Sequence, residues 1–269
     1  MRLPAIRTRP RGGAGGALRS APGILLPATV AVVVLCATLP ASAAGFAPPS
    51  GCESFATIQN RACSVSVVWR CDLAPEGDFW EANFSSDGLE SVVSYDRDYQ
   101  WLDAAYSWDQ SREEFTPPAA DRISLDDLLA TGVDTFDFTM RRATPDRHYD
   151  IRVVGADMLT GETATIDGYR LDEVKTRLEI VDDEGVTEYA AQGTQYYSRD
   201  LGLFFFGAEQ VFGPDGEASA YDDRPTDIIL PGEPGFGATR PLYGCDLQDA
   251  AFTPAAPSPA QKETNHDQL

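Results

Sequence analysis

Alternation of apolar and polar residues over short segments is the feature that most constrains the fold of this chain. It runs from Thr57 to Leu230, with turn residues between the segments. In the clearest segment, CSVSVVWRC at 63–71, one face would carry Cys63, Val65, Val67, Trp69 and Cys71. A period of two residues is that of a β-strand with one face on a core. Strand after strand with tight turns predicts an antiparallel meander of about ten to twelve strands.

Several turns and strand faces follow from the same pattern. Ser86-Asp87-Gly88 predicts a hairpin between strands at Phe79–Ser85 and Leu89–Leu102. In the second strand we expect one face with Val93, Tyr95, Tyr99 and Trp101, and the other with Asp96, Asp98 and Gln100. Two later apolar faces are expected at Phe136, Phe138 and Met140, and at Tyr149, Ile151 and Val153.

The last third of the strand series has its own turn signals. A turn is predicted at Thr160-Gly161 and further strands at Thr163–Tyr169, Glu173–Val181, Val186–Tyr197, Leu201–Phe212, Glu217–Tyr221 and Thr226–Leu230. The run Leu203–Phe206 breaks the alternation, so we expect both faces of that strand to be covered.

One helix is predicted, in the segment ISLDDLLATG. Ser124 is a suitable N-cap, Asp126 and Asp127 suit the first turn, and Gly132 can end the helix.

The expected fold is therefore mainly β: an antiparallel meander forming a curved sheet, half-barrel or barrel, with one short helix. We expect a single β-rich domain over residues 45–252, a length that can bury a sizeable core. The Pro/Gly-rich segment PGEPGFGATRP predicts a fixed coil that ends at Cys245, and residues 253–269 predict a disordered tail.

The first 44 residues have the order of a secretion signal. An Arg-rich start is followed by an apolar run at Ile24–Leu39 and by small residues at Ala41–Ala44. The run is shorter than the roughly 20 apolar residues of a spanning helix, although an uncleaved anchor remains an alternative. We expect cleavage between Ser42 and Phe46, a periplasmic or secreted protein, and membrane contact only through the signal segment.

The cysteines beyond the signal predict two disulfides. Cys52, Cys63, Cys71 and Cys245 are an even number in an oxidising compartment, and their spacing does not suit a structural zinc site. A straight strand would hold Cys63 and Cys71 about 26 Å apart, at roughly 3.3 Å per residue. A disulfide needs Cα atoms within about 7 Å, which disfavours that pair.

Two pairings remain. Cys52–Cys71 with Cys63–Cys245 would place a hairpin turn at Asn60-Arg61-Ala62, a polar and plausible bend. Cys52–Cys63 with Cys71–Cys245 would centre the turn on Thr57-Ile58, two β-branched residues that resist tight turns. We favour the first pairing, and the second stays open.

The charge of the chain excludes some partners. It has 21 Lys and Arg against 42 Asp and Glu, and the first acid is Glu53, after the five arginines of the signal. Such a surface repels phosphate backbones, so we expect no nucleic-acid binding. The acidity serves solubility or, alternatively, attracts cations or basic partners.

No motif identifies a reaction, and we assign no catalytic residue, cofactor or metal ligand. His148 at a strand start and His266 in the tail are the histidines available as a general base. Carboxylate pairs could hydrolyse glycosidic bonds, and the pairs considered are Asp96 with Asp98, Glu113 with Glu114, Asp182–Glu184, and Asp222 with Asp223. Calcium is a further alternative, although no Asp-x-Asp-x-Asp-Gly loop occurs.

Three segments carry a resemblance: SVSVVWRC, LTGETATIDG and LPGEPGFGATRPLYGC. Together they resemble uncharacterised exported proteins of Gram-negative bacteria. The resemblance implies export and a shared fold, and it implies no activity.

These observations favour an exported, disulfide-stabilised binding protein of the cell envelope over an enzyme. The aromatic strand faces suggest a hydrophobic or lipid-like ligand, or an envelope protein as partner. The alternatives are a carboxylate-dependent hydrolase, which requires converging carboxylates in a pocket, and a structural envelope protein without a ligand, which requires a filled core.

Overall fold

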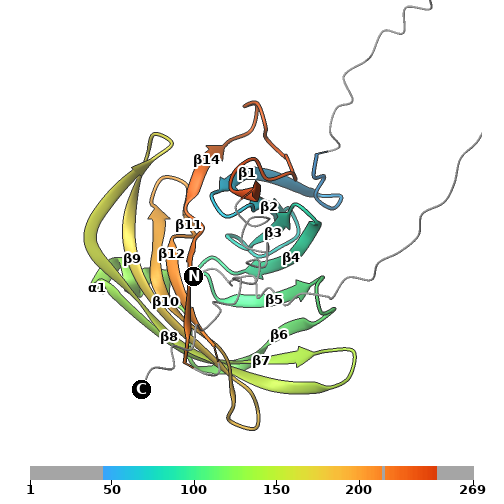
Figure 1. Ribbon diagram of the computed structural model, residues 1–269, viewed down its shortest axis with the longest axis vertical. Coiled ribbons are helices and arrows are strands. Elements are labelled where there is room, and N and C mark those ends of the chain that lie inside the picture. The colour runs from blue at the N-terminus through green and yellow to red at the C-terminus, as the bar shows by residue number, and fades with distance from the viewer. Residues whose placement is uncertain (1–44, 214–215, 247–269) are drawn as a thin grey trace, which may run out of the picture.

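The computed structural model describes residues 45–213 and 216–246, and most of them form one strongly curved antiparallel sheet (Figure 1). The signal expected at residues 1–44 and the tail expected at 253–269 lie outside the described residues. The elements are β1 (Cys52–Asn60), β2 (Val65–Cys71), β3 (Phe79–Ser85), β4 (Gly88–Tyr95), β5 (Trp101–Tyr106), β6 (Arg112–Asp121), α1 (Leu125–Thr131), β7 (Val133–Ala143), β8 (His148–Ile166), β9 (Tyr169–Val181), β10 (Thr187–Ser198), β11 (Leu203–Phe205), β12 (Ala208–Phe212), β13 (Ala218–Asp222) and β14 (Pro225–Ile229).

The strand order confirms the predicted meander. It runs β13-β12-β10-β9-β8-β7-β6-β5-β4-β3-β2-β1-β14, and β11 pairs with β10 beside this path. The sheet is not closed, because β13 and β14 lie at its two ends. Only Asp223 and Arg224 separate these two strands in the sequence. The curvature therefore brings the last strands back to the first one, and β14 pairs with β1.

The main hydrophobic cluster is shared by nearly all the strands. It includes the predicted apolar faces, namely Val93, Tyr95, Tyr99, Trp101, Phe136, Phe138, Met140, Tyr149, Ile151 and Val153. Leu203, Phe204 and Phe205 are all buried, as their break in alternation predicts. The aromatic rings pack on one another, and Tyr99 contacts both Phe79 and Phe204 with ring centroids 4.9 Å apart.

A second, smaller cluster covers the other face of β2 and β3. Its buried members are Val65, Val67, Trp69, Ala82 and Phe84, and Phe46 from the start of the described chain packs on Trp69 and Phe84. Val68 of β2 belongs to the main cluster instead. Strand β2 is therefore buried on both faces, whereas its sequence predicts one.

Helix α1 begins and ends where the sequence predicts. The hydroxyl of Ser124 accepts a hydrogen bond from the backbone N–H of Asp127, and Gly132 ends the helix in a left-handed conformation with φ of 86°. Leu128 is the buried residue of the helix, which packs against β7 and β8.

Three predicted strand boundaries are wrong for local reasons. The strand predicted at Leu89–Leu102 is divided into β4 and β5, because the carboxylate of Asp96 accepts the backbone N–H groups of Asp98 and Gln100 and stabilises a turn. The turn predicted at Thr160-Gly161 is a bulge within β8, and the hairpin turn lies at 167–168 instead.

The strand predicted at Leu201–Phe212 is divided into β11 and β12. Both pair with β10, and Gly207 lies between them where a Cβ atom would meet the Thr194 carbonyl oxygen at 1.8 Å. This close backbone approach requires glycine. Each of these two divisions adds a strand, the bulged β8 merges two expected strands into one, and β6 was not expected from the sequence. The described residues form fourteen strands, where about ten to twelve were expected.

Candidate functional site

The disulfides join Cys52 to Cys71 and Cys63 to Cys245, which is the pairing favoured by the hairpin argument. In the register of β1 and β2, Cys52 lies directly opposite Cys71. Cys63 lies in the turn between these strands, with φ of 54°, rather than at the start of the straight strand expected from 63 to 71.

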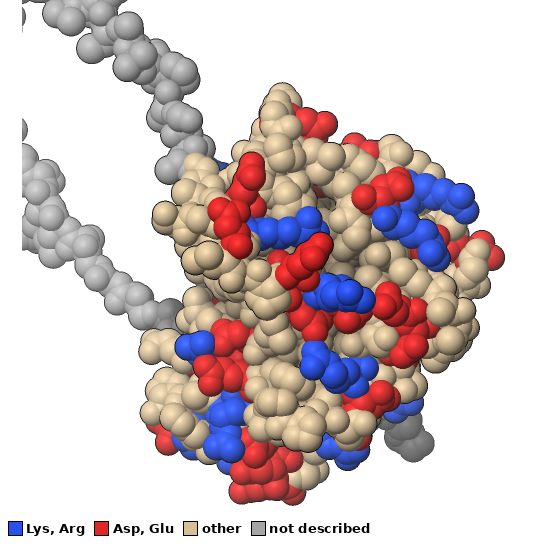
Figure 2. Space-filling model, turned by 180° about the vertical axis from the view of Figure 1, so that it is seen from behind, with Lys and Arg blue, Asp and Glu red and all other residues tan. Residues whose placement is uncertain are grey.

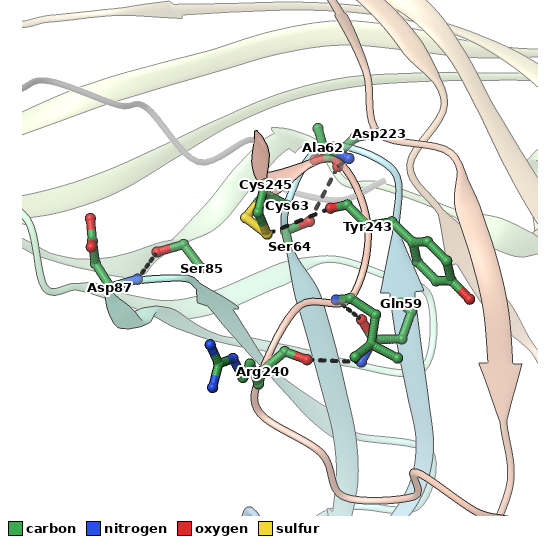
Figure 3. Close-up of a disulfide and its surroundings, with 11 residues drawn as sticks. Gln59, Ala62, Cys63, Ser64, Ser85, Asp87, Asp223, Arg240, Tyr243 and Cys245 are labelled. Carbon is green, nitrogen blue, oxygen red and sulfur yellow. Dashed lines mark hydrogen bonds between the residues drawn. A yellow bond between two sulfur atoms is a disulfide. The ribbon is translucent and has the colours of Figure 1, made fainter. Parts of the chain in front are cut away.

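The second disulfide fixes the coil that follows β14 (Figure 3). Gln59 of β1 donates to the carbonyl of Arg240 and accepts from the backbone N–H of Leu242. The backbone N–H of Cys63 donates to the carbonyl of Tyr243. The coil predicted from the Pro/Gly-rich segment is therefore held in one position along β1, and it can form one wall of a binding site.

The larger of two recesses described in the structure lies between this coil, β14 and the β8–β9 turn. We call it the acidic groove. It has a volume of about 450 Å³, and its lining residues are Asp167, Gly168, Tyr169, Asp227, Ile228, Ile229, Glu233 and Pro234. The smaller recess, of about 200 Å³, lies by the end of the coil, around Arg240 and Leu242.

Three carboxylates of the acidic groove are held by neutral donors. Asp167 accepts the backbone N–H of Ile228 at 2.8 Å, Glu233 accepts that of Leu230 at 2.6 Å, and Asp227 accepts the hydroxyl of Tyr243 at 2.8 Å. Burial raises the pKa of Tyr169, and the nearby negative charges of Glu233 and Asp167 raise it further. The groove thus combines an aromatic side chain with acceptors of fixed position.

Among the described residues, no Lys or Arg forms an ion pair with any of these three carboxylates. Elsewhere the acids are commonly paired across strands, as in Arg112 with Asp103 at 2.7 Å and Arg141 with Asp150 at 2.5 Å. Figure 2 shows this interspersed pattern of acidic and basic side chains on one face. The acidic groove is therefore a local excess of negative charge.

The structure places arginines beside most of the carboxylates considered from the sequence. Asp96 and Asp98 lie in a turn, bound to Arg122 and Arg97, rather than together on a strand face. The 182–184 turn is bound by Arg147, and Asp222 by Arg61 and Arg224. His148 is exposed at the start of β8.

Glu113 and its neighbour Glu114 are separated by the strand alternation. Glu114 is exposed and pairs with Arg112. Glu113 is buried, and its carboxylate accepts from Arg142 of β7 and from the hydroxyl of Tyr106. Arg142 also pairs with Glu188 of β10, and the same carboxylate accepts the Tyr149 hydroxyl at 2.8 Å.

Another buried carboxyl pair was not found from the sequence. Asp134 of β7 and Asp157 of β8 lie directly opposite each other in the strand register, and 5% and 2% of their surfaces are exposed. Asp134 continues the spacing of Phe136 and Phe138, and Asp157 continues that of Val153. Each acid occupies a position that the strand alternation assigns to the apolar face. That pattern could have identified the pair from the sequence.

Within residues 45–213 and 216–246, no three His, Cys, Asp or Glu side chains are grouped so that they could hold a metal ion. No helix of that part of the chain is long and apolar enough to cross a membrane. The calcium alternative therefore has no supporting cluster in the described residues.

No family model matches the chain, and no curated protein and no solved structure matches it either. We therefore infer a function from the residues of the chain itself.

Proposed function

We propose that this chain is an exported binding protein of the Gram-negative cell envelope and that its acidic groove binds a basic segment of another envelope protein. The observation that carries the proposal is a recess of about 450 Å³ whose three carboxylates have no cationic partner among the described residues. The two disulfides indicate an oxidising compartment outside the cytoplasm, which supports export.

The chemistry of the lining favours a Lys or Arg side chain. A guanidinium or ammonium group can donate hydrogen bonds to the acceptor positions that Asp167, Asp227 and Glu233 retain. The ring of Tyr169 offers an aromatic surface to the same cation. Because the carboxylates are already positioned by backbone N–H groups or Tyr243, little side-chain ordering is required on binding.

The net charge supports the same partner. With a formal charge of −21, the chain attracts a basic segment over distances set by the ionic strength. Binding should therefore weaken steeply as salt is added.

A lipid-like ligand, the expectation from the aromatic strand faces, has less support. Those aromatic residues pack on one another in the main cluster, as Tyr197 does on Phe204 with centroids 4.8 Å apart. A ligand in that position would have to displace packed side chains.

The test is binding of a fluorescent penta-lysine peptide, measured by anisotropy at low and moderate salt. Replacing Asp227→Asn and Glu233→Gln together should weaken binding at least about tenfold, which corresponds to roughly 1.4 kcal/mol. The matched control is Asp72→Asn with Glu76→Gln, two exposed acids outside the groove that change the net charge equally.

Equal losses in both double variants would show non-specific attraction by net charge and contradict the proposal. Native mass spectrometry of protein purified from the periplasm, before and after organic extraction, tests the other ligand class. A co-purifying lipid-like mass would favour a carrier over a basic-segment binder.

A further inference from the structure

The buried carboxyl pair Asp134 and Asp157 lies at one end of the sheet, beneath helix α1. Residues opposite each other in antiparallel strands have Cβ atoms about 5 Å apart and on the same face. Both residues are almost completely buried. Two negative charges at this separation, away from water, are strongly disfavoured unless a cation or a proton compensates them.

The hydrogen-bond donors to the pair are neutral. The backbone N–H of Ser124 donates to Asp134 at 3.1 Å, and the hydroxyl of Thr176 of β9 donates to Asp157. The described residues place no Lys or Arg in an ion pair with either carboxylate. Lys175 and Arg177 flank Thr176, but the alternation of β9 turns their side chains to the opposite face.

The other charged groups around the pair are acids or are already paired. On β6, Asp121 accepts the hydroxyl of Thr135 at 2.7 Å. On α1, Asp126 and Asp127 lie in the first turn, and Asp126 pairs with Arg97. In the same cross-strand row, Thr176 is followed by Gly193 of β10, which has no side chain, and then by Glu209 of β12. Every unpaired group here is therefore negative or neutral.

Helix α1 is bound to one member of this pair, Asp134. Asp134 binds the N-cap residue of α1 through the Ser124 N–H, and the carbonyl of Gly132, at the other end of the helix, accepts the N–H of Leu159. The helix has seven residues and one buried side chain, Leu128. Leu125 and Leu129 also pack, partly buried, against the main cluster. A helix of two turns held by so few side chains is expected to open at a lower free energy than the strands beneath it.

We propose that Asp134 and Asp157 share one proton in the folded protein and that loss of this proton releases helix α1 from the sheet. The device makes this end of the molecule sensitive to the pH outside the cytoplasm. It is independent of the acidic groove, which involves other residues.

The expected titration range agrees with the geometry. Burial raises the pKa of Asp134 to about 7. The hydrogen bond from Ser124 acts against this effect, and the negative charges of Asp157 and Asp121 add to it. Burial also raises the pKa of Asp157, against the effect of the Thr176 hydroxyl. The pair can therefore release its proton near neutral pH.

The test is hydrogen–deuterium exchange of the α1 amides between pH 6 and 9, corrected for intrinsic exchange. In the unaltered protein, protection of α1 should fall about tenfold per pH unit above pH 7, because one pKa unit is a factor of ten in the equilibrium. In Asp157→Asn the charge of Asp157 no longer raises the pKa of Asp134, so the loss of protection should move to lower pH. The control Asp137→Asn, on the outer side of β7, should behave like the unaltered protein.

Glu209 requires a second control, because burial and the charge of Asp223 raise its pKa to about 7 as well. Glu209→Gln should leave the pH dependence at α1 intact. The same loss of protection in Asp157→Asn as in the unaltered protein would overturn the proposal. If Asp157→Asn does not fold, Asp134→Asn serves instead. Absence of a protonated-carboxyl infrared band in the unaltered protein at pH 6 would also overturn it.

Discussion

The two ends of strand β7 each place a charged side chain at the edge of the hydrophobic core, but the charges of the neighbouring side chains differ. Asp134 and Arg142 lie on one face of this strand, eight residues apart, which corresponds to about 26 Å. Phe136, Phe138 and Met140 lie between them in the main cluster. A charged residue therefore lies at each end of this row of apolar side chains. Arg142 pairs with acids, whereas Asp134 lies opposite another acid.

At the Arg142 end, the ion pair opposes the effect of burial on the pKa of Glu113. Only 12% of the Arg142 side chain and 1% of that of Glu113 are exposed. Burial raises the pKa of Glu113, while Arg142 and the Tyr106 hydroxyl act in the opposite direction. Burial alone would lower the pKa of Arg142, but Glu113, Tyr149 and Glu188 outweigh it and raise the value. The cation that this end places beside its buried acid is what the Asp134 end lacks among the described residues.

At the Asp134 end, the described residues place no cation in an ion pair with Asp134 or Asp157, and we propose that a proton takes its place. The contrast teaches that burial of an acid does not by itself define its role. The neighbouring strand decides the outcome, since Glu113 faces Arg142 in the register while Asp134 faces Asp157.

The largest expected effect is at the cationic end. Arg142→Met should lower the free energy of unfolding by about 3–5 kcal/mol, because Glu113 would be left buried without its partner. Urea denaturation measures it. Arg141→Met is the matched control, since Arg141 is half exposed and pairs with Asp150 on the outer side, and it should cost about 0–1 kcal/mol. Similar losses in both variants would contradict the comparison.

Glu113→Gln tests the same end from the acidic side. The amide keeps an acceptor but removes the charge that Arg142 contacts, so the free energy of unfolding should fall by about 2–3 kcal/mol. Glu114→Gln, an exposed neighbour with the same change, is the control and should remain within about 0.5 kcal/mol of the unaltered protein. A stabilised Glu113→Gln protein would show that Arg142 does not need this partner.

The equivalent change at the other end should have the opposite sign. The pKa of Asp134 is raised to about 7 from an ordinary value of 3.8, so the folded protein holds a proton that the unfolded chain releases. Stability from this group is therefore complete below pH 4 and is lost as the pH rises toward 7. Asp134→Asn should raise the free energy of unfolding at pH 8 by about 2 kcal/mol and change it little at pH 4. Urea denaturation of both proteins at the two pH values measures this. If the free energy of unfolding of Asp134→Asn depended on pH as that of the unaltered protein does, the prediction would be wrong.

The smallest expected effect concerns the donor to the proton-sharing pair. Thr176→Val removes the hydroxyl that donates to Asp157, and it should lower the free energy of unfolding by about 1 kcal/mol. Because that hydroxyl favours the charged carboxylate, its loss should also move the pH dependence to higher pH. Thr135→Val, which removes the donor to the exposed Asp121, should leave the pH dependence in place.

Much of the fold could be predicted from local patterns. The hairpin at 86–88, the helix from its Ser124 cap to Gly132, and the covered faces of Leu203–Phe205 all follow from residues close in sequence. The division of β4 from β5 could not be predicted from alternation, because the Asp96 carboxylate competes for the backbone N–H groups that a continuous strand would use.

The candidate sites could be predicted from the sequence less well than the fold. The acidic groove joins Asp167, Asp227 and Glu233 from the β8–β9 turn, β14 and the coil. Their approach depends on the curvature of the sheet and on the coil fixed by Cys245. The favoured disulfide pairing could be predicted from the sequence, since strand length disfavours Cys63–Cys71 and turn composition favours Asn60–Ala62.

The sequence by itself determined the β-meander, the short helix and the chemistry of the cysteines, because alternation, capping and chain reach are properties of neighbouring residues. Only the tertiary structure decided which buried acid meets a cation. Strand register sets that choice: Glu113 is opposite Arg142 and Asp134 is opposite Asp157. Register depends on turns and bulges along the whole sheet, and a shift of one residue would turn each side chain to the other face.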